Sequence, residues 1–230
     1  TTGSENTALG DYALADNTTG AQNVAVGKQA LGQNTTASDN TAVGFESLMD
    51  NTTGTNNTAV GKRAGYNITT GDDNTAIGQE ALYTATTASD NTAIGFQALY
   101  YNTSGASNVA VGWNALVNNT TGGTNTGIGY QALTNNTTAA GNTAVGYNAL
   151  TANTTGTTSV AVGAYTLDAQ TTGTQNTALG YAAMSATTTG NYNTAVGTSA
   201  LSVHTTGNEN TAVGQGAMIA LTSGANNVAM

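Results

Sequence analysis

The sequence contains no cysteine and no proline, and only 7% of its 230 residues are charged. Without cysteine no disulfide framework can form, so packing and backbone hydrogen bonds must stabilise the fold. Three residues are basic (Lys28, Lys62 and Arg63) against twelve acidic ones, which gives a formal net charge of -9. This balance argues against a nucleic-acid partner, because too few side chains could neutralise phosphates.

Side chains for catalysis and metal binding are also scarce. With one histidine, His204, and no cysteine, neither a Cys-His pair nor a Ser-His-Asp arrangement has its parts, and zinc lacks ligands. We interpret His204 as a tolerated substitution at a corner of the fold. Asp73 and Asp90 could share a cation such as Ca²⁺, but we interpret them as part of a solvated corner. The sequence therefore predicts no enzyme activity, no metal site and no cofactor.

No stretch of the chain approaches the ~20 consecutive apolar residues of a membrane-spanning helix. The sequence shows no signal peptide and no initiator methionine, and it begins in the middle of a repeat. We therefore expect this chain to be a segment of a longer polypeptide whose anchor lies outside it, and we expect no membrane span within the segment.

Glycine recurs every 17 residues along the whole chain. Such a period predicts identical coils stacked along an axis, because each coil must present the same residue types to its neighbours. We expect a single repeat array over residues 1–230, with about 13.5 coils of 17 residues. The glycines that mark the coils are Gly10, Gly27, Gly44, Gly61, Gly78, Gly95, Gly112, Gly129, Gly146, Gly163, Gly180, Gly197 and Gly214.

Positions in the repeat are numbered here from this glycine. Positions −4 to −1 mostly read Asn, Thr or Val, Ala, and Val, Ile or Leu; leucine is common at +4, and threonine occupies +8 in every coil. The segment before the glycine predicts a β-strand that turns sharply at the glycine, and the Ala-Leu pair at +3 and +4 predicts a second strand. We therefore expect an all-β, parallel β-solenoid (β-roll) in which the asparagine and threonine columns form hydrogen-bonded ladders.

Alternation along the first strand places positions −3 and −1 on one face and the asparagine and alanine columns on the other. We expect the −3 and −1 residues to form the core and the small Asn/Ala face to pack against another chain. One coil offers only about three substantial apolar side chains, a thin core for an isolated solenoid. This favours a side-by-side homo-oligomer, with a trimer as the expected state.

Aromatic residues follow the repeat glycine in several successive coils and form a candidate recognition stripe. Such a column can serve in stacking or packing between chains, or as a platform for sugar rings or a receptor. A second run consists of Tyr66, Tyr83 and Tyr100, joined by Tyr101. Asn-Thr-Thr sequons also recur and are candidate glycan attachment sites. The stripe consists of Phe96, Trp113, Tyr130, Tyr147 and Tyr181, and the sequons are at Asn17, Asn34, Asn51, Asn119, Asn136 and Asn153.

The run Asn-Val-Ala-Val-Gly, at residues 23–27 and 108–112, and its Asn-Thr-Ala-Val-Gly and Asn-Thr-Ala-Ile-Gly variants resemble the repeats of YadA-like heads in trimeric autotransporter adhesins. Similar repeats occur in phage and viral tail fibres. The resemblance covers the whole chain, although the repeats here are longer than typical head repeats. It implies left-handed parallel β-rolls in which three chains pack side by side, and a function in attachment.

We therefore expect a non-catalytic structural attachment fibre, either a tail-fibre shaft or an adhesin rod. The expected location is extracellular, on a cell surface or on a virion, with a surface glycan or receptor as a candidate partner. Two alternatives stay open: an ice-binding β-solenoid and a subunit of an extracellular matrix or sheath filament. The threonine column favours ice binding, but adjacent threonines on a strand would point to opposite faces.

Overall fold

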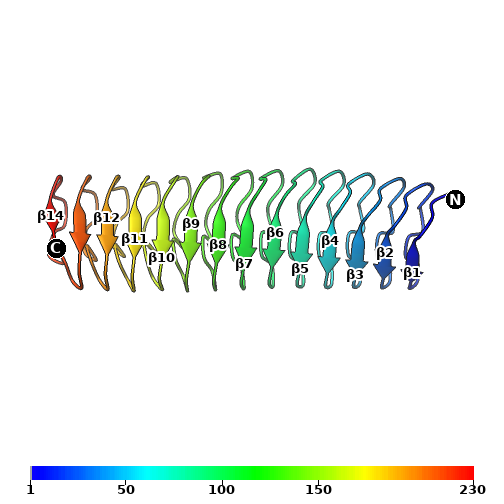
Figure 1. Ribbon diagram of the computed structural model, residues 1–230, viewed down its shortest axis with the longest axis horizontal. Coiled ribbons are helices and arrows are strands. Elements are labelled where there is room, and N and C mark those ends of the chain that lie inside the picture. The colour runs from blue at the N-terminus through cyan, green and yellow to red at the C-terminus, as the bar shows by residue number, and fades with distance from the viewer. Residues whose placement is uncertain (1) are drawn as a thin grey trace. The chain divides into compact units, whose positions relative to one another are not determined.

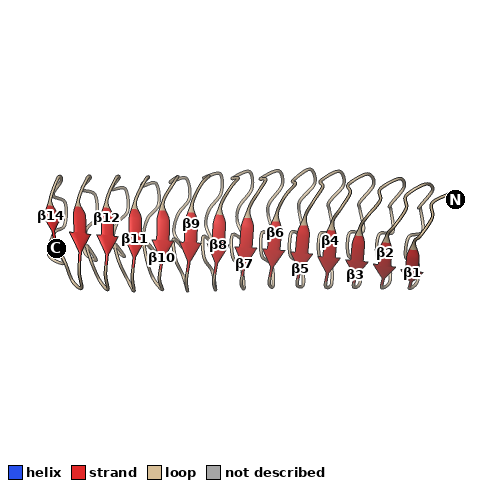
Figure 2. Cartoon of the chain, viewed as in Figure 1, coloured by secondary structure: helices blue, strands red, loops and turns tan. Residues whose placement is uncertain are grey.

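The computed structural model describes residues 2–230, and this part of the chain contains β-strands and turns but no helix. Each repeat contributes one short strand (Figure 2). Strands β1 to β13 each end at the residue before a repeat glycine. The strands are β1 (Thr7–Leu9), β2 (Val24–Val26), β3 (Thr41–Val43), β4 (Thr58–Val60), β5 (Thr75–Ile77), β6 (Thr92–Ile94), β7 (Val109–Val111), β8 (Thr126–Ile128), β9 (Thr143–Val145), β10 (Val160–Val162), β11 (Thr177–Leu179), β12 (Thr194–Val196), β13 (Thr211–Val213) and β14 (Val228–Ala229).

The chain forms two compact units. The first unit comprises Thr1–Asn114 and Asn118–Thr121, and the second comprises Ala115–Val117 and Gly122–Met230. Within each unit, consecutive strands pair in parallel (Figure 1). Each strand residue pairs with the residue at the same position of the next repeat; Thr41 pairs with Thr58, for example. The predicted all-β parallel solenoid with 17 residues per turn is thus confirmed.

The repeat glycines form the sharp corner that the sequence predicts. All thirteen have positive φ, between 126° and 143°, a region that L side chains rarely adopt. A Cβ atom added at Gly44 would also collide with the carbonyl group of Gly61 in the next coil. The corner therefore requires glycine for both its backbone angle and its close contact with the neighbouring coil.

The predicted second strand at Ala-Leu is wrong, because this segment forms a run of turns. In the second coil, the N–H of Ala30 donates to the carbonyl of Gly27 (3.3 Å), and the N–H of Leu31 donates to Ser47 in the next coil (3.0 Å). The column leucines have φ between 47° and 54°, in the left-handed region that is uncommon for such side chains. Leu31 is fully buried, so this backbone conformation directs the side chain into the core.

The predicted core face is also wrong. Position −2 alanines such as Ala25 and Ala42 are fully buried, whereas the flanking residues Val24 and Val26 are partly exposed. The interior is filled by the leucines of the turn and by the asparagine columns, so only a small side chain fits at position −2. Positions −3 and −1 point outward and form what we call the outer strand face.

Buried asparagines at position −4 form the predicted ladder inside the coil. In Asn40, Nδ2 donates to the carbonyl of Gly54 (2.8 Å), and Oδ1 accepts from the backbone N–H of Asn57 (2.9 Å). The N–H of Asn40 in turn donates to Oδ1 of Asn23 (3.0 Å). Because both ends of the amide are bonded, burial of this polar group is tolerated, and each asparagine links its coil to its neighbours.

A second asparagine column lies at position +7, and in the first unit it is interrupted at Ile68 and Ala85. Asn34 donates to Oδ1 of Asn17 (2.9 Å), whereas Oδ1 of Asn51 is buried without a hydrogen-bond partner. The next residue in the column is Ile68, whose aliphatic side chain has no amide group that could donate a hydrogen bond to Asn51 Oδ1. Gly65 replaces the core leucine in the same coil, and a Cβ atom added there would lie 2.9 Å from Leu48 Cδ2 and 3.1 Å from Ile68 Cδ1. The two exceptional residues therefore compensate each other.

Candidate recognition surface

The outer strand face is a regular, largely apolar surface of each unit. Its position −3 holds threonine or valine, and its position −1 holds valine, isoleucine or leucine in every coil up to Val213. Ile77 is 37% exposed and Leu179 is 47% exposed, which is high for side chains of this type. Neither column contains a titratable residue, so this face is uncharged and consists largely of methyl groups.

Position −3 shows which property of the side chain matters on this face. Threonine fills it in ten strands and valine in four, at Val24, Val109, Val160 and Val228. The two residues have nearly the same shape and differ by a hydroxyl group. The hydroxyl is thus dispensable here, whereas the β-branched shape is retained in all repeats. This pattern is typical of a surface that packs against another surface.

The aromatic stripe lies at position +1, and its rings stack within each unit. In the first unit, Phe96 and Trp113 have ring centroids 6.0 Å apart and ring planes inclined by 13°. In the second unit, Tyr130 and Tyr147 stack at 5.1 Å with an angle of 7°. The predicted stacking is confirmed for these two pairs.

Tyr165 belongs to the same stripe, although the sequence prediction missed it. Position +1 of its coil is Ala164, and Tyr165 at position +2 takes the place of the missing ring. Its ring makes edge contacts with Tyr147 (5.2 Å) and Tyr181 (5.9 Å). A tyrosine adjacent to the gap in the column was the signal that could have identified it.

The stacking limits what the stripe can bind. Sugar rings bind aromatic side chains through the ring face, and the faces of Tyr130 and Tyr147 are turned toward each other. One face of each ring is therefore covered by the other ring, although the residues are 40% and 44% exposed. The geometry favours the stacking role over a platform for sugar rings.

The second aromatic run forms a stack in the first unit. Tyr66 and Tyr83 lie 5.3 Å apart, Tyr83 and Tyr100 lie 4.9 Å apart, and Tyr101 contacts Tyr100 edge-on at 4.6 Å. Burial raises the pKa of the Tyr66 hydroxyl, and the nearby carboxylates of Asp50 and Glu46 raise it further. Burial likewise raises the pKa of Tyr100.

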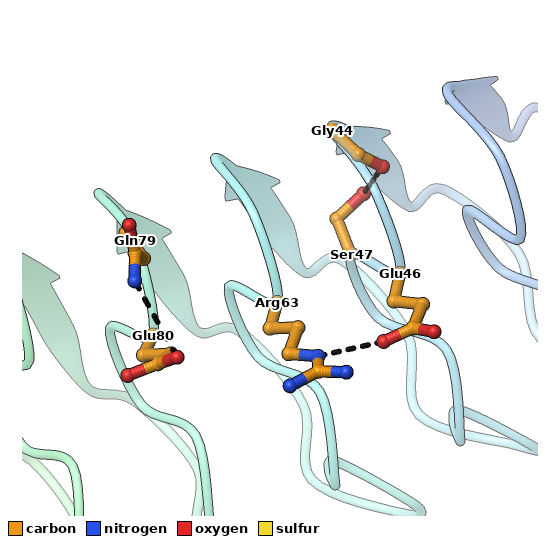
Figure 3. Close-up of polar contacts among 6 residues, drawn as sticks. All are labelled: Gly44, Glu46, Ser47, Arg63, Gln79 and Glu80. Atoms are coloured by element: carbon orange, nitrogen blue, oxygen red, sulfur yellow. Dashed lines mark hydrogen bonds and ion pairs between the residues drawn. The ribbon is translucent and has the colours of Figure 1, made fainter.

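The one guanidinium group lies at the end of this stack. Nε of Arg63 donates to Oε2 of Glu46 in the preceding coil at 2.7 Å (Figure 3). The Arg63 guanidinium carbon also lies 5.8 Å from the ring centroid of Tyr66 and 5.9 Å from that of Phe45. The arrangement links neighbouring coils by charge and by cation–π contact, and it leaves the guanidinium engaged by partners within the chain.

The candidate N-glycosylation asparagines all lie in the buried +7 column. Their exposed fractions are 7% for Asn17 and 0% for the other five. Nδ2 is the atom that would carry a glycan, and in Asn153 it donates to Asn136 Oδ1 (3.0 Å) and to the carbonyl of Gly156 (3.0 Å). The folded coil therefore does not present these amides to a glycosyltransferase.

His204 also lies in the +7 column, where most coils have asparagine, and its side chain is fully buried, which its interpretation as a tolerated substitution did not specify. Its Nε2 lies 3.2 Å from Nδ2 of Asn210, and its Nδ1 lies 3.5 Å from Oγ1 of Thr187. Burial lowers the pKa of this imidazole. The imidazole lies among the side-chain groups of the ladder, and His204 thus takes the place of a ladder asparagine.

Asp73 and Asp90 are exposed, as the predicted solvated corner requires. Across residues 2–230, no cluster of three or more His, Asp or Glu side chains is arranged to hold a metal ion. The same residues contain no helix with the length and apolarity of a membrane span. A scan against protein-family models finds no match to this sequence, and neither does a search of curated proteins.

Proposed function

We propose that this protein is a non-catalytic structural attachment fibre in which chains associate side by side, three at a time, through the outer strand face. The observation that carries the proposal is the composition of that face: it is uncharged and partly exposed, and its position −3 is β-branched in every repeat. The Asn/Ala face expected to pack between chains is buried within each coil. The packing surface of the proposal is accordingly the opposite face of the same strands.

Identical solenoids suit this mode of association. Every coil presents the same side-chain pattern at the same spacing, so a contact made by one pair of coils is repeated by each following pair. Burial of apolar surface contributes about 25 cal/mol per Å², and small contributions summed over many coils give a stable interface. The resemblance to adhesin heads and tail fibres supports an extracellular, cell-surface or virion location and a role in attachment to a surface glycan or receptor.

The native mass tests the proposal directly. Light scattering after size exclusion should give three times the chain mass of 22.7 kDa. Ile77→Lys places a charge on the outer strand face and should reduce the mass to that of a monomer. The matched control is Gln79→Lys, which adds the same charge at position +1, where Lys28 and Lys62 occur naturally. The control should remain a trimer.

Other outcomes would contradict the proposal. A monomeric parent chain would remove lateral association, and an ice-recrystallisation assay would then test the ten threonines of the same face. Indefinite filaments in electron micrographs, in place of discrete fibres, would support a matrix or sheath subunit. Loss of the trimer in both lysine variants would show that added charge alone disrupts assembly, and the outer strand face would no longer be implicated.

A further inference from the structure

Position +9 holds a hydroxyl side chain in every coil and is exposed in every coil. It follows the position +8 threonine at the bend opposite the glycine corner. The residues of this hydroxyl column are Thr19, Thr36, Thr53, Thr70, Thr87, Ser104, Thr121, Thr138, Thr155, Thr172, Thr189, Thr206 and Ser223.

The solenoid makes no use of these hydroxyl groups. At position +8, Oγ1 of Thr154 donates to the carbonyl of Thr171 in the next coil at 3.1 Å, and most coils repeat this bond. At position +9, in contrast, no side-chain hydroxyl in residues 2–230 donates or accepts a hydrogen bond, as Thr155 illustrates. The ladder therefore explains the threonine at +8 but not the hydroxyl at +9.

Backbone geometry does not explain the column either. None of its residues has positive φ, and asparagine, aspartate or glycine would suit a bend equally well. Other exposed positions vary freely: position +12 holds residues as different as Gln22, Tyr192 and Glu209. At position −3 threonine exchanges with valine, which keeps the shape, whereas at +9 it exchanges with serine, which keeps only the hydroxyl. The hydroxyl group is thus the retained feature at +9.

We infer that the hydroxyl column is a set of O-glycosylation sites. An exposed hydroxyl without an internal acceptor is available as a nucleophile, and small neighbours leave it accessible, because position +10 is always glycine or alanine. The hydroxyl oxygen attacks the anomeric carbon of a nucleotide-activated sugar, and the bond from that carbon to the nucleoside diphosphate breaks. The diphosphate leaves, and the hydroxyl proton passes to a base of the transferase.

Charge distinguishes a sugar from a phosphate at these positions. Neighbouring coils lie about 4.8 Å apart, and each phosphate would add almost two negative charges to a chain whose net charge is already -9. Charges of one sign at that spacing repel one another strongly. A neutral sugar avoids this repulsion and hydrates a surface that has only two charged residues, Asp168 and Glu209, after position 90.

Peptide mapping of the protein purified from its natural source tests the inference. Three basic residues give trypsin few cleavage sites, so the denatured protein is cut with chymotrypsin at its leucine and aromatic residues, and electron-transfer fragmentation then locates the sugars. We expect hexose or hexosamine mass increments on position +9 and none on positions +8 or −3. Unmodified +9 residues, phosphate increments, or sugars spread equally over all three columns would overturn the inference.

A pair of variants produced in the native host separates modification from stability. Thr172→Val should remove the sugar from its coil and leave the melting temperature of the deglycosylated protein unchanged, because this hydroxyl makes no internal bond. Its coil carries Gln170 at position +7 and therefore has no Asn-Thr-Thr sequon that the substitution could destroy. Thr143→Val is the matched control at position −3, where valine occurs naturally, and it should leave the glycan pattern intact. A loss of stability in deglycosylated Thr172→Val would instead assign the hydroxyl a structural role. Either result is independent of the oligomeric state.

Discussion

Replacing Ser159 and Gln170 together by asparagine should leave the solenoid about as stable as it is, whereas either replacement alone should destabilise it. Ser159 stands in the −4 column, and Gln170 stands in the +7 column of the same coil. The serine is shorter than the usual asparagine and the glutamine is longer. In the structure, Nε2 of Gln170 reaches Oγ of Ser159 (3.2 Å), and Oε1 of Gln170 accepts from Nδ2 of Asn176 (2.8 Å).

The size of the effect follows from these contacts. The shorter side chain in Gln170→Asn no longer reaches Ser159 Oγ and Asn176 Nδ2. Each lost hydrogen bond costs about 0.5–1.5 kcal/mol. Ser159→Asn alone inserts a second amide where that of Gln170 already lies, and such overpacking costs about 1–3 kcal/mol. The double variant reproduces the arrangement of Asn142 and Asn153 in the preceding coil. The two sites should therefore show a coupling free energy of about 2 kcal/mol or more.

Denaturant unfolding of the four proteins, followed by circular dichroism, measures this coupling. Asn153→Gln is a control in the opposite direction: its longer side chain meets the amide of Asn142, so it should be destabilising even though glutamine is tolerated one coil later. Additive effects of the Ser159 and Gln170 replacements would refute the reasoning. A neutral Gln170→Asn variant would show that the two columns do not compensate each other.

Three further predictions concern the interior of the coils. Gly65→Leu should destabilise the fold because its side chain meets both Leu48 and Ile68. Adding Ile68→Asn restores the residue pair of the neighbouring coils, in which consecutive core leucines pack together, and should restore stability in thermal melts; failure of the rescue would refute the proposed exchange. Asn40→Leu should cost roughly 2–4 kcal/mol in denaturant unfolding, because it leaves the buried N–H of Asn57 without an acceptor and removes one of the two side-chain hydrogen bonds to the Gly54 carbonyl; a cost below about 1 kcal/mol would contradict the ladder. Because the pKa of His204 is lowered in the folded state, the folded protein binds fewer protons than the unfolded chain, so stability should fall as the pH drops below about 6.5. The His204→Asn variant should lack this fall in melting temperature, and an identical pH profile in both proteins would refute the assignment.

The sequence identified the period and the elements that depend on it. The glycine column predicted the sharp corner because only glycine adopts its backbone angle, and the strand before it followed from β-branched residues. The asparagine and threonine ladders were also predictable, since a column of identical side chains in a stacked array meets itself at every coil. Stacking of Tyr130 on Tyr147 followed for the same reason.

Other features depended on which side of each coil faces inward. The alternation of side chains along a strand shows which residues share a face. Hydrophobicity alone suggested that Val24 and Val26 would lie in the core of the coil. The turn decided otherwise: the left-handed backbone at Leu31 directs the leucine inward and leaves room only for alanine beneath the strand. The sequon asparagines and His204 became buried for the same reason, because their position in the turn points into the coil.

The sequence by itself therefore determined the repeat, the parallel stacking and the residue columns, because these follow from translation of one coil onto the next. Only the tertiary structure decided the inside and the outside of the coil. That choice depends on how a 17-residue loop closes around a narrow interior, and hence on turn angles and on the bonding of buried amides. It turned the apolar strand residues into a surface available to other chains and left the +9 hydroxyls exposed without a bond of their own.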